Sequence, residues 1–344
     1  MSVALTSFWR VAMASGWCLV GLLQSGCALP ARQAAVDCSE VEAHAAVPWR
    51  SLAPGVWVWE GARGDIAAEN QGHVVPTSLV VDEGEALVVD PGPSFLHGVR
   101  VRHSVACRFG ARVRWVVNTH AHAENVLANS AFAESGQTTI VSGAATLASM
   151  RERCPACLAS LRARVGEAAM AGTEIVLPAR TLQAGDELPV GRLRLRVMLF
   201  EQAHTEGDLV LWYPGLSVLW AGGLAYLERL PELSQGSLDG WLAALDQLDA
   251  LAPAHVVSAV VSSAERKGEL PEAMRATRAY LGALRQGVLR SMDEGHQPQQ
   301  AGLVPLQAFA GWPGYPERHL FNVQRAWREL EPVWMDRALG TSPH

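Results

Sequence analysis

Short apolar runs alternate with helical patterns along one continuous segment of this chain, and few folds accommodate such an order. We expect helices at 94–109, 124–133, 144–171 and 238–251. We expect strands at 55–60, 78–81, 86–89, 113–117, 193–199, 209–213 and 218–221. No linker rich in proline, glycine or serine divides the segment. The order predicts a single α/β domain over about 50–265, followed by a helical C-terminal extension over 266–344 that packs on it.

Composition limits the class of partner. The chain has 344 residues, of which 49% are hydrophobic and 18% charged, as expected of a sequence that forms a globular core. The net charge is −6 and the isoelectric point is near 6.0. Because no basic stripe or aromatic-interleaved basic run is present, we expect no nucleic-acid partner and look instead for a small-molecule substrate.

The first 28 residues have the layout of a signal peptide. Arg10 precedes an apolar run over 11–23, and small residues follow at 25–28. The run is about 13 residues long, short of the ~20 that a spanning helix needs. We therefore predict an exported, periplasmic protein. Cys27 leaves a lipoprotein signal open as the one route to a membrane, although Gln24 stands where such a site requires an aliphatic residue.

An even number of cysteines follows the predicted signal. Cys38, Cys107, Cys154 and Cys157 could form two disulfides in an oxidising compartment. Cys154 and Cys157 could instead form a redox or metal pair. They interrupt a helical stretch and do not open a helix after a strand, so we favour a structural role.

Histidines follow two predicted strands. His120 and His122 lie in the sequence Asn-Thr-His-Ala-His-Ala-Glu-Asn directly after the strand at 113–117, and His204 comes just after another strand. Zinc in catalytic sites typically binds three protein ligands and one water. The spacing therefore predicts one zinc ion on these three imidazoles. A divalent ion with this neutral ligand set lowers the pKa of its water toward ~7, which supplies a nucleophile at neutral pH.

These residues resemble the signature of the metallo-β-lactamase superfamily, His-x-His-x-Asp-His at a strand end. Asp90, in Val-Val-Asp-Pro-Gly, matches the earlier acidic position of the family, and His204 matches the next ligand histidine. The resemblance covers about 50–265. It implies a four-layer αββα sandwich, and a role for Asp90 in orienting a metal-bound imidazole or its loop.

Four further segments are similar to one branch of that superfamily, the exported quinoprotein relay system zinc metallohydrolases, which resemble sulfur-oxidation accessory hydrolases. The segments are 119–132, 154–173, 237–242 and 321–327. This resemblance implies an association with periplasmic quinoprotein dehydrogenases and with pyrroloquinoline quinone.

The chain departs from the family pattern at the second metal. Glu124 and Asn125 replace the Asp and final His of the signature, Gly223 stands at the position of a bridging Asp, and Val260 at that of a last His. The side chains of glycine and valine offer no donor atom, so we expect the second site to be degenerate.

Two functions follow. In a mononuclear zinc hydrolase of thioesters, lactones or lactams, Glu124 would act as general acid/base and Asn125 would donate to the developing oxyanion. The alternative is a catalytically silent pseudoenzyme that serves a quinoprotein dehydrogenase as a binding or accessory protein.

Overall fold

The structure is a computed structural model that describes residue 38 and residues 46–133 and 136–338. The predicted signal segment 1–28, with Cys27, lies outside the described residues. Among the helices that are described, none is both long enough and apolar enough to span a lipid bilayer.

One sheet has seven strands in sequential order, β1 to β7. The strands β4, β5, β6 and β7 run parallel, whereas β1 to β4 pair antiparallel. Parallel strands bring the carboxyl ends of β4 and β5 to the same edge. The strands are β1 (Arg50–Ala53), β2 (Val56–Trp59), β3 (Thr77–Asp82), β4 (Glu85–Val89), β5 (Arg112–Asn118), β6 (Thr139–Ser142) and β7 (Arg180–Thr181).

The other sheet has six strands in the order β13-β12-β11-β10-β9-β8. All its pairs are antiparallel except β11 with β12. The strands are β8 (Glu187–Val190), β9 (Leu193–Phe200), β10 (Asp208–Tyr213), β11 (Val218–Trp220), β12 (His255–Val257) and β13 (Val261–Ser263).

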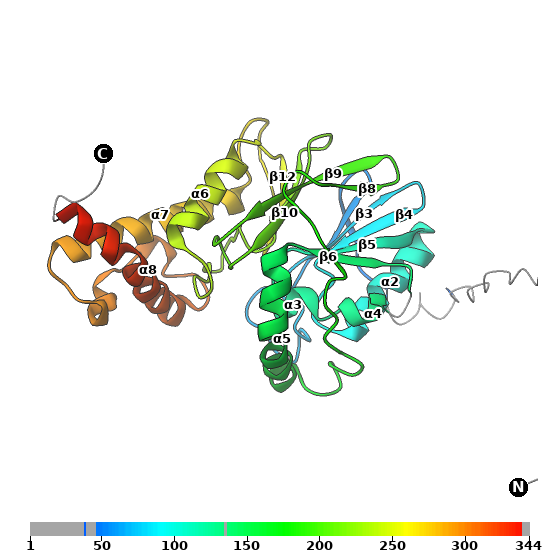
Figure 1. Ribbon diagram of the computed structural model, residues 1–344, viewed down its shortest axis with the longest axis horizontal. Helices are drawn as coiled ribbons and strands as arrows, with labels where there is room; N and C mark the ends of the chain where they lie inside the picture. Colours follow the sequence, from blue (N-terminus) through cyan, green and yellow to red (C-terminus); the bar gives the residue numbers. More distant parts are fainter. Residues whose placement is uncertain (1–37, 39–45, 134–135, 339–344) are drawn as a thin grey trace, which may run out of the picture. The chain divides into compact units, whose positions relative to one another are not determined.

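Helices flank both sheets (Figure 1). Some follow strands of the first sheet: α2 (Phe95–Phe109), α3 (Ala123–Val126), α4 (Asn129–Ala133) and α5 (Ala144–Val165). Others follow or precede strands of the second: α6 (Leu238–Asp249), α7 (Glu272–Asp293) and α8 (Tyr315–Ala338), with short 3-10 turns at Pro298–Leu303 and Gln307–Phe309.

Side chains of the central strands alternate between two cores, because successive residues of a strand face opposite sides of the sheet. On β10, Leu209 and Leu211 enter the core between the sheets, whereas Val210 and Trp212 face the helices. Burying such side chains is worth about 1.5–3 kcal/mol each. The two-residue period thus builds an inner layer that both sheets share.

The outer faces of the sheets are covered by different helices. The first sheet shares a core with α2 and α4, through residues such as Val101 and Phe132. The second shares a larger core with α6, α7 and α8, through Trp241, Tyr280 and Trp327. Helix, sheet, sheet and helix follow one another, so the predicted αββα sandwich is confirmed.

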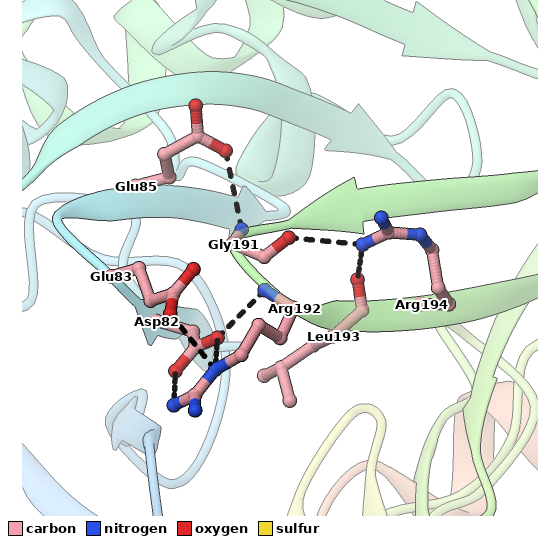
Figure 2. A network of polar contacts seen from close by, with 7 residues as sticks. All are labelled: Asp82, Glu83, Glu85, Gly191, Arg192, Leu193 and Arg194. Carbon is pink, nitrogen blue, oxygen red and sulfur yellow. Dashed lines mark hydrogen bonds and ion pairs between the residues drawn. The ribbon is translucent and has the colours of Figure 1, made fainter.

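Polar contacts join the two sheets at two levels. In the inner core, the indole of Trp220 on β11 donates to Ser78 Oγ on β3 at 2.6 Å. At the tips, the β8–β9 turn docks on the β3–β4 turn: the Arg192 amide donates to Asp82 at 2.8 Å and the Gly191 amide to Glu85 at 3.2 Å, as Figure 2 shows. This network lies at the amino end of β4, whereas Asp90 follows its carboxyl end.

Several elements differ from the sequence expectation. The helix expected over 124–133 is two short helices, because α3 ends at its C-cap Leu127. The helix expected over 144–171 ends at Val165, where Gly166 adopts φ 88°. Within the helical extension expected over 266–344, the last helix is long, Tyr315–Ala338, and includes Pro332.

Candidate metal centre

The first two histidines lie on the loop that leaves β5. Asn118, the last residue of β5, exchanges hydrogen bonds of 3.0 and 2.8 Å with the side chain of Asn129. His122 is the N-cap of α3 and has extended backbone, φ −91° and ψ 143°. The extended backbone brings the His122 ring to 4.7 Å from that of His120, centroid to centroid.

His204 lies on the loop between β9 and β10. The backbone and hydroxyl of Thr205 donate to the Asp208 carboxylate at 2.9 and 3.0 Å, which closes the loop into a tight turn. The backbone amide of Leu209, the residue after Asp208, donates to the Thr119 carbonyl at 2.8 Å. This bond ties the His204 loop of one sheet to the His120 loop of the other.

The three imidazoles form one cluster, as the sequence predicted. Their potential ligand atoms all lie within 4.8 Å of one another. The His204 ring is 5.1 Å from that of His120 and 4.9 Å from that of His122, and His204 Nε2 is 3.4 Å from His122 Nδ1. A single metal ion could bind all three residues.

The orientation of His120 is fixed through Thr119 and Asp90. The Asp90 carboxylate accepts the Thr119 amide at 2.9 Å and its hydroxyl at 2.7 Å. The Thr119 oxygen is also 2.8 Å from His120 Nδ1. The Thr119 hydroxyl donates its proton to Asp90, so its oxygen accepts a hydrogen bond from His120 Nδ1–H. In this tautomer the lone pair of the ring is on Nε2, where it can bind a metal ion.

Burial keeps the cluster suited to a cation. It lowers the pKa of His120 and His204 well below the ordinary value, so both rings are neutral at pH 7. Only neutral imidazole has the lone pair that a metal needs. Burial also raises the pKa of Asp90 to about 7, against the hydrogen bonds from Thr119 and Asn125. The donor set fits zinc, which binds histidine nitrogen in tetrahedral sites.

His204 sits on a surface shaped by its neighbours. A Cβ on Gly223 would lie 2.1 Å from His204 Cδ2 and 2.6 Å from Nε2, so only glycine leaves room for the ring. Two aromatic rings also lie beside His204: the centroids of the Trp241 and Tyr226 rings are 4.9 and 5.9 Å from that of the His204 ring. Tight packing of this kind restricts the imidazole to one rotamer.

The two residues that follow the histidines have different surroundings. Glu124 is half-buried and lines a cavity of about 400 Å³ together with His122. Asn125 is buried, and its amide donates to the Asp90 carboxylate, while its Oδ1 has no hydrogen-bond partner. The structure therefore places Glu124 at the open side of the cluster and Asn125 behind it, in support of Asp90.

Val260 lies in a neighbouring and smaller cavity of about 120 Å³, with apolar residues such as Val74 and Leu227. Its side chain offers packing surface only. Nearby, Ser258 accepts the Ala225 amide at 2.8 Å and donates to the Gly222 carbonyl at 2.6 Å. These bonds hold the loop that presents Gly223 to His204.

The four cysteines behave in two ways. Cys38 and Cys107 form a disulfide, one of the bridges that the even count allowed.

Cys154 and Cys157 are free thiols, so the second bridge is absent. They lie one turn apart on α5 and face different neighbours: Cys154 is buried beside Met150, and Cys157 lines the Glu124 cavity. Burial raises the pKa of both thiols, that of Cys154 to about 12, which is not the state of a reactive cysteine.

Some residues of the site carried no sequence signal. Tyr226 contacts His204, and the arginines Arg164, Arg229 and Arg318 line the same cavity as Glu124. None belongs to a recognisable motif. Thr119 directly precedes a predicted ligand, and its hydroxyl links Asp90 to His120, but the sequence alone gave no sign of this contact.

The chain belongs to the metallo-beta-lactamase superfamily, whose family model matches residues 71–259. The match includes the three histidines, Asp90 and Gly223 but ends one residue before Val260. No curated protein matches the sequence.

Solved structures share the fold at low sequence identity. A metallo-beta-lactamase from Pontibacter korlensis aligns with a TM-score of 0.51 and 17% identity, over 68% of this chain and 98% of that one. A metallo-beta-lactamase from Erythrobacter litoralis aligns with a TM-score of 0.51 and 15% identity, over 68% and 95%. Identities this low establish the common fold and nothing more specific.

Proposed function

We propose that this protein is an exported hydrolase that uses one zinc ion, held by His120, His122 and His204, to cleave an acyl bond of the thioester, lactone or lactam type. The observation that carries the proposal is the cluster of three imidazoles, two of them buried, with a carboxylate, Glu124, on its open side. When bound, zinc supplies Lewis acidity and activates water at neutral pH.

Each residue has a separate task in this proposal. Asp90 and Thr119 hold the tautomer and direction of His120. Glu124, in the first turn of α3, takes the proton from the attacking water and returns it to the leaving group. Asn125 donates to Asp90, so the structure favours support of that carboxylate over contact with an oxyanion.

Export is supported by two independent features. The signal-like first 28 residues are one. The disulfide between Cys38 and Cys107 is the other, because such bonds persist mainly in oxidising compartments. We propose a periplasmic location, with lipidation at Cys27 as a variant of it. The proposed link to quinoprotein dehydrogenases rests on the sequence resemblance alone.

A substitution tests the hydrolase directly. We expect the zinc-loaded mature protein to cleave at least one chromogenic thioester, lactone or lactam, and Glu124→Gln to lower kcat/KM roughly 10²- to 10⁴-fold without loss of zinc. Glu152→Gln, an exposed position on α5, is the matched control and should leave the rate unchanged. Equal rates in the wild type and Glu124→Gln would contradict the assigned role.

The second candidate is a silent accessory protein of the same fold. It is favoured by one observation, that Gly223 and Val260 bring no donor atom to the site. This candidate predicts zinc binding without cleavage of any substrate class, and a cellular phenotype that Glu124→Gln leaves intact. The rate comparison above therefore distinguishes the two.

A further inference from the structure

The loop between β11 and α6 contacts His204 at two places. Near the start of the loop, Gly223 leaves room for the His204 ring. Near its end, Gly236 packs on the backbone, where an added Cβ would lie 2.0 Å from the Ala203 carbonyl oxygen and 2.7 Å from that of His204. The Ser237 amide then donates to the Ala203 carbonyl at 3.0 Å. The position of His204 therefore depends on the path of this loop.

Between these two contacts, the loop reaches the imidazole itself. Nε2 of His204 points to the cluster and lies 3.4 Å from His122 Nδ1. Nδ1 of His204 is buried and has no hydrogen bond of ordinary length and angle. The backbone carbonyl of Glu232 is close enough to act on the pKa of His204, which it raises while burial lowers it. This carbonyl is therefore the acceptor that is available to Nδ1–H.

The C-terminal helix α8 holds the loop on both sides of Glu232. Asn322 of this helix is buried, with 1% of its surface exposed. Its Nδ2 donates to the Pro231 carbonyl at 2.8 Å, and its Oδ1 accepts the Leu233 amide at 3.1 Å. The carboxylate of Glu232 pairs with Arg318, also on α8, at 3.0 Å. One helix thus holds the backbone and the side chain of the residue whose carbonyl faces the imidazole.

The same face of α8 also holds the end of the loop. Arg325 donates to the Gly236 carbonyl at 3.0 Å. The Glu329 carboxylate accepts the Ser237 hydroxyl at 2.6 Å and the Leu238 amide, at the start of α6, at 2.8 Å. With the two α8 residues described above, these side chains form a stripe with spacings of four, three and four residues, which is one face of a helix. The stripe therefore directs α8 at the loop that passes His204.

We propose, on the basis of the three-histidine metal site proposed above, that Asn322 and Arg325 are positioning residues for the metal ligand His204. Asn322 keeps the Glu232 carbonyl against the ring, where it accepts Nδ1–H and leaves the lone pair on Nε2 for the metal. Arg325 keeps Gly236 against the backbone of the ligand. The nitrogen with which a histidine binds a metal is set by the hydrogen bond that its other nitrogen makes. The C-terminal helix thereby acts on the metal site from outside it.

A pair of buried substitutions tests the role of Asn322. Asn322→Leu removes both bonds to the loop, and we expect zinc affinity to fall roughly tenfold. Tyr280→Phe is the matched control, because it removes a hydroxyl that accepts from Asn322 at 2.9 Å but leaves both loop bonds in place. It should lower stability and spare zinc affinity. Competition with a chromogenic chelator measures the affinity of each variant.

Arg325→Ala is a milder change that tests the same loop, also where Asn322→Leu does not fold. It removes the bond to the Gly236 carbonyl, and we expect zinc binding to weaken roughly threefold, as for the loss of one hydrogen bond. Arg328→Ala, at an exposed position of the same helix, is its control and should bind zinc as the wild type does. Equal zinc affinities in these two variants would overturn the proposal.

The tautomer of His204 is a readout that needs neither metal nor activity. Nitrogen-15 NMR of the metal-free mature protein should show His204 protonated on Nδ1 in the wild type and in Tyr280→Phe, and a mixture of tautomers in Asn322→Leu. If no zinc binds but the tautomer depends on Asn322 in this way, the zinc proposal fails and the positioning role stands.

Three results would contradict the positioning role. They are protonation of His204 on Nε2 in the wild type, an unchanged tautomer in Asn322→Leu, and equal zinc affinities in Asn322→Leu and Tyr280→Phe.

Discussion

Two halves of the candidate site differ in the donor atoms of their side chains. One half contains the three imidazoles, and the other contains Gly223 and Val260. The first half brings three nitrogens within 4.8 Å and fixes one of them through Thr119 and Asp90. The second half brings a hydrogen atom and an isopropyl group. Only the first half therefore offers nitrogen atoms that could bind a metal ion.

The comparison also shows that the two halves depend on each other. The space that a side chain at position 223 would need is filled by the His204 ring. Glycine at this position therefore serves the first half by allowing His204 its place. In this structure, the position of the His204 ring therefore depends on glycine at position 223.

The largest expected effect comes from removing ligands of the first half. His120→Ala/His204→Ala leaves a single imidazole, and we expect bound zinc to fall from about one to below about 0.1 per chain, since zinc affinity resides in its protein ligands. Elemental analysis after dialysis is the measurement. Circular dichroism is the control for folding. A variant that is folded and still binds zinc would refute the assigned ligands.

Gly223→Ala should have the next largest effect, because the added Cβ displaces His204. We expect zinc affinity to fall roughly 100-fold and stability to fall by about 1–3 kcal/mol from overpacking. Gly282→Ala on α7 is the matched control, since no atom lies within 4 Å of its added Cβ. Zinc affinity at the wild-type level in Gly223→Ala would break the proposed link between the two halves. Competition with a chromogenic chelator gives both affinities.

Thr119→Val should have a smaller effect, because it removes the hydroxyl between Asp90 and His120 but leaves all three ligands. We expect roughly tenfold weaker zinc binding. Ser104→Ala is the control, because it removes a buried hydroxyl that is not part of the histidine cluster. This hydroxyl accepts a hydrogen bond from the Trp49 indole at 2.8 Å. The substitution should lower stability and spare zinc affinity. Equal zinc affinities in the two variants would mean that Thr119 does not orient His120.

Loss of the disulfide should leave both halves unchanged. Cys38→Ser/Cys107→Ser opens a loop with a sequence separation of 69 and should destabilise the protein by about 4 kcal/mol. Zinc affinity should match the wild type where the variant is folded. Urea unfolding measures the loss of stability, and chelator competition measures the zinc affinity. A loss of zinc affinity in the folded variant would show that the disulfide also shapes the site.

Parts of the fold were predictable because their signal is local. Strands such as β4 and β10 have both faces buried, so each appears in the sequence as a short run of apolar residues. The strand β7 has only two residues, Arg180 and Thr181, and is too short and too polar to form such a run. The break between α3 and α4 depends on how Leu127 and Asn129 pack and bond, which spacing does not reveal.

The candidate site divides in the same way. His120, His122 and His204 follow strand ends, and the fold brings strand ends together, so their cluster could be predicted. The contact between Arg318 and Asp65 joins residues 253 positions apart, and the fit of His204 on Gly223 depends on packing in three dimensions. Neither leaves a pattern along the chain.

The most direct test of a one-metal site is the number of zinc ions bound by the mature wild-type protein, determined by elemental analysis after equilibration with excess zinc and removal of unbound ion. The three imidazoles, with no donor atom from the side chains of Gly223 and Val260, predict about one per chain. Two per chain would show that the second half holds a metal after all, and none would show that the histidine cluster is not a zinc site.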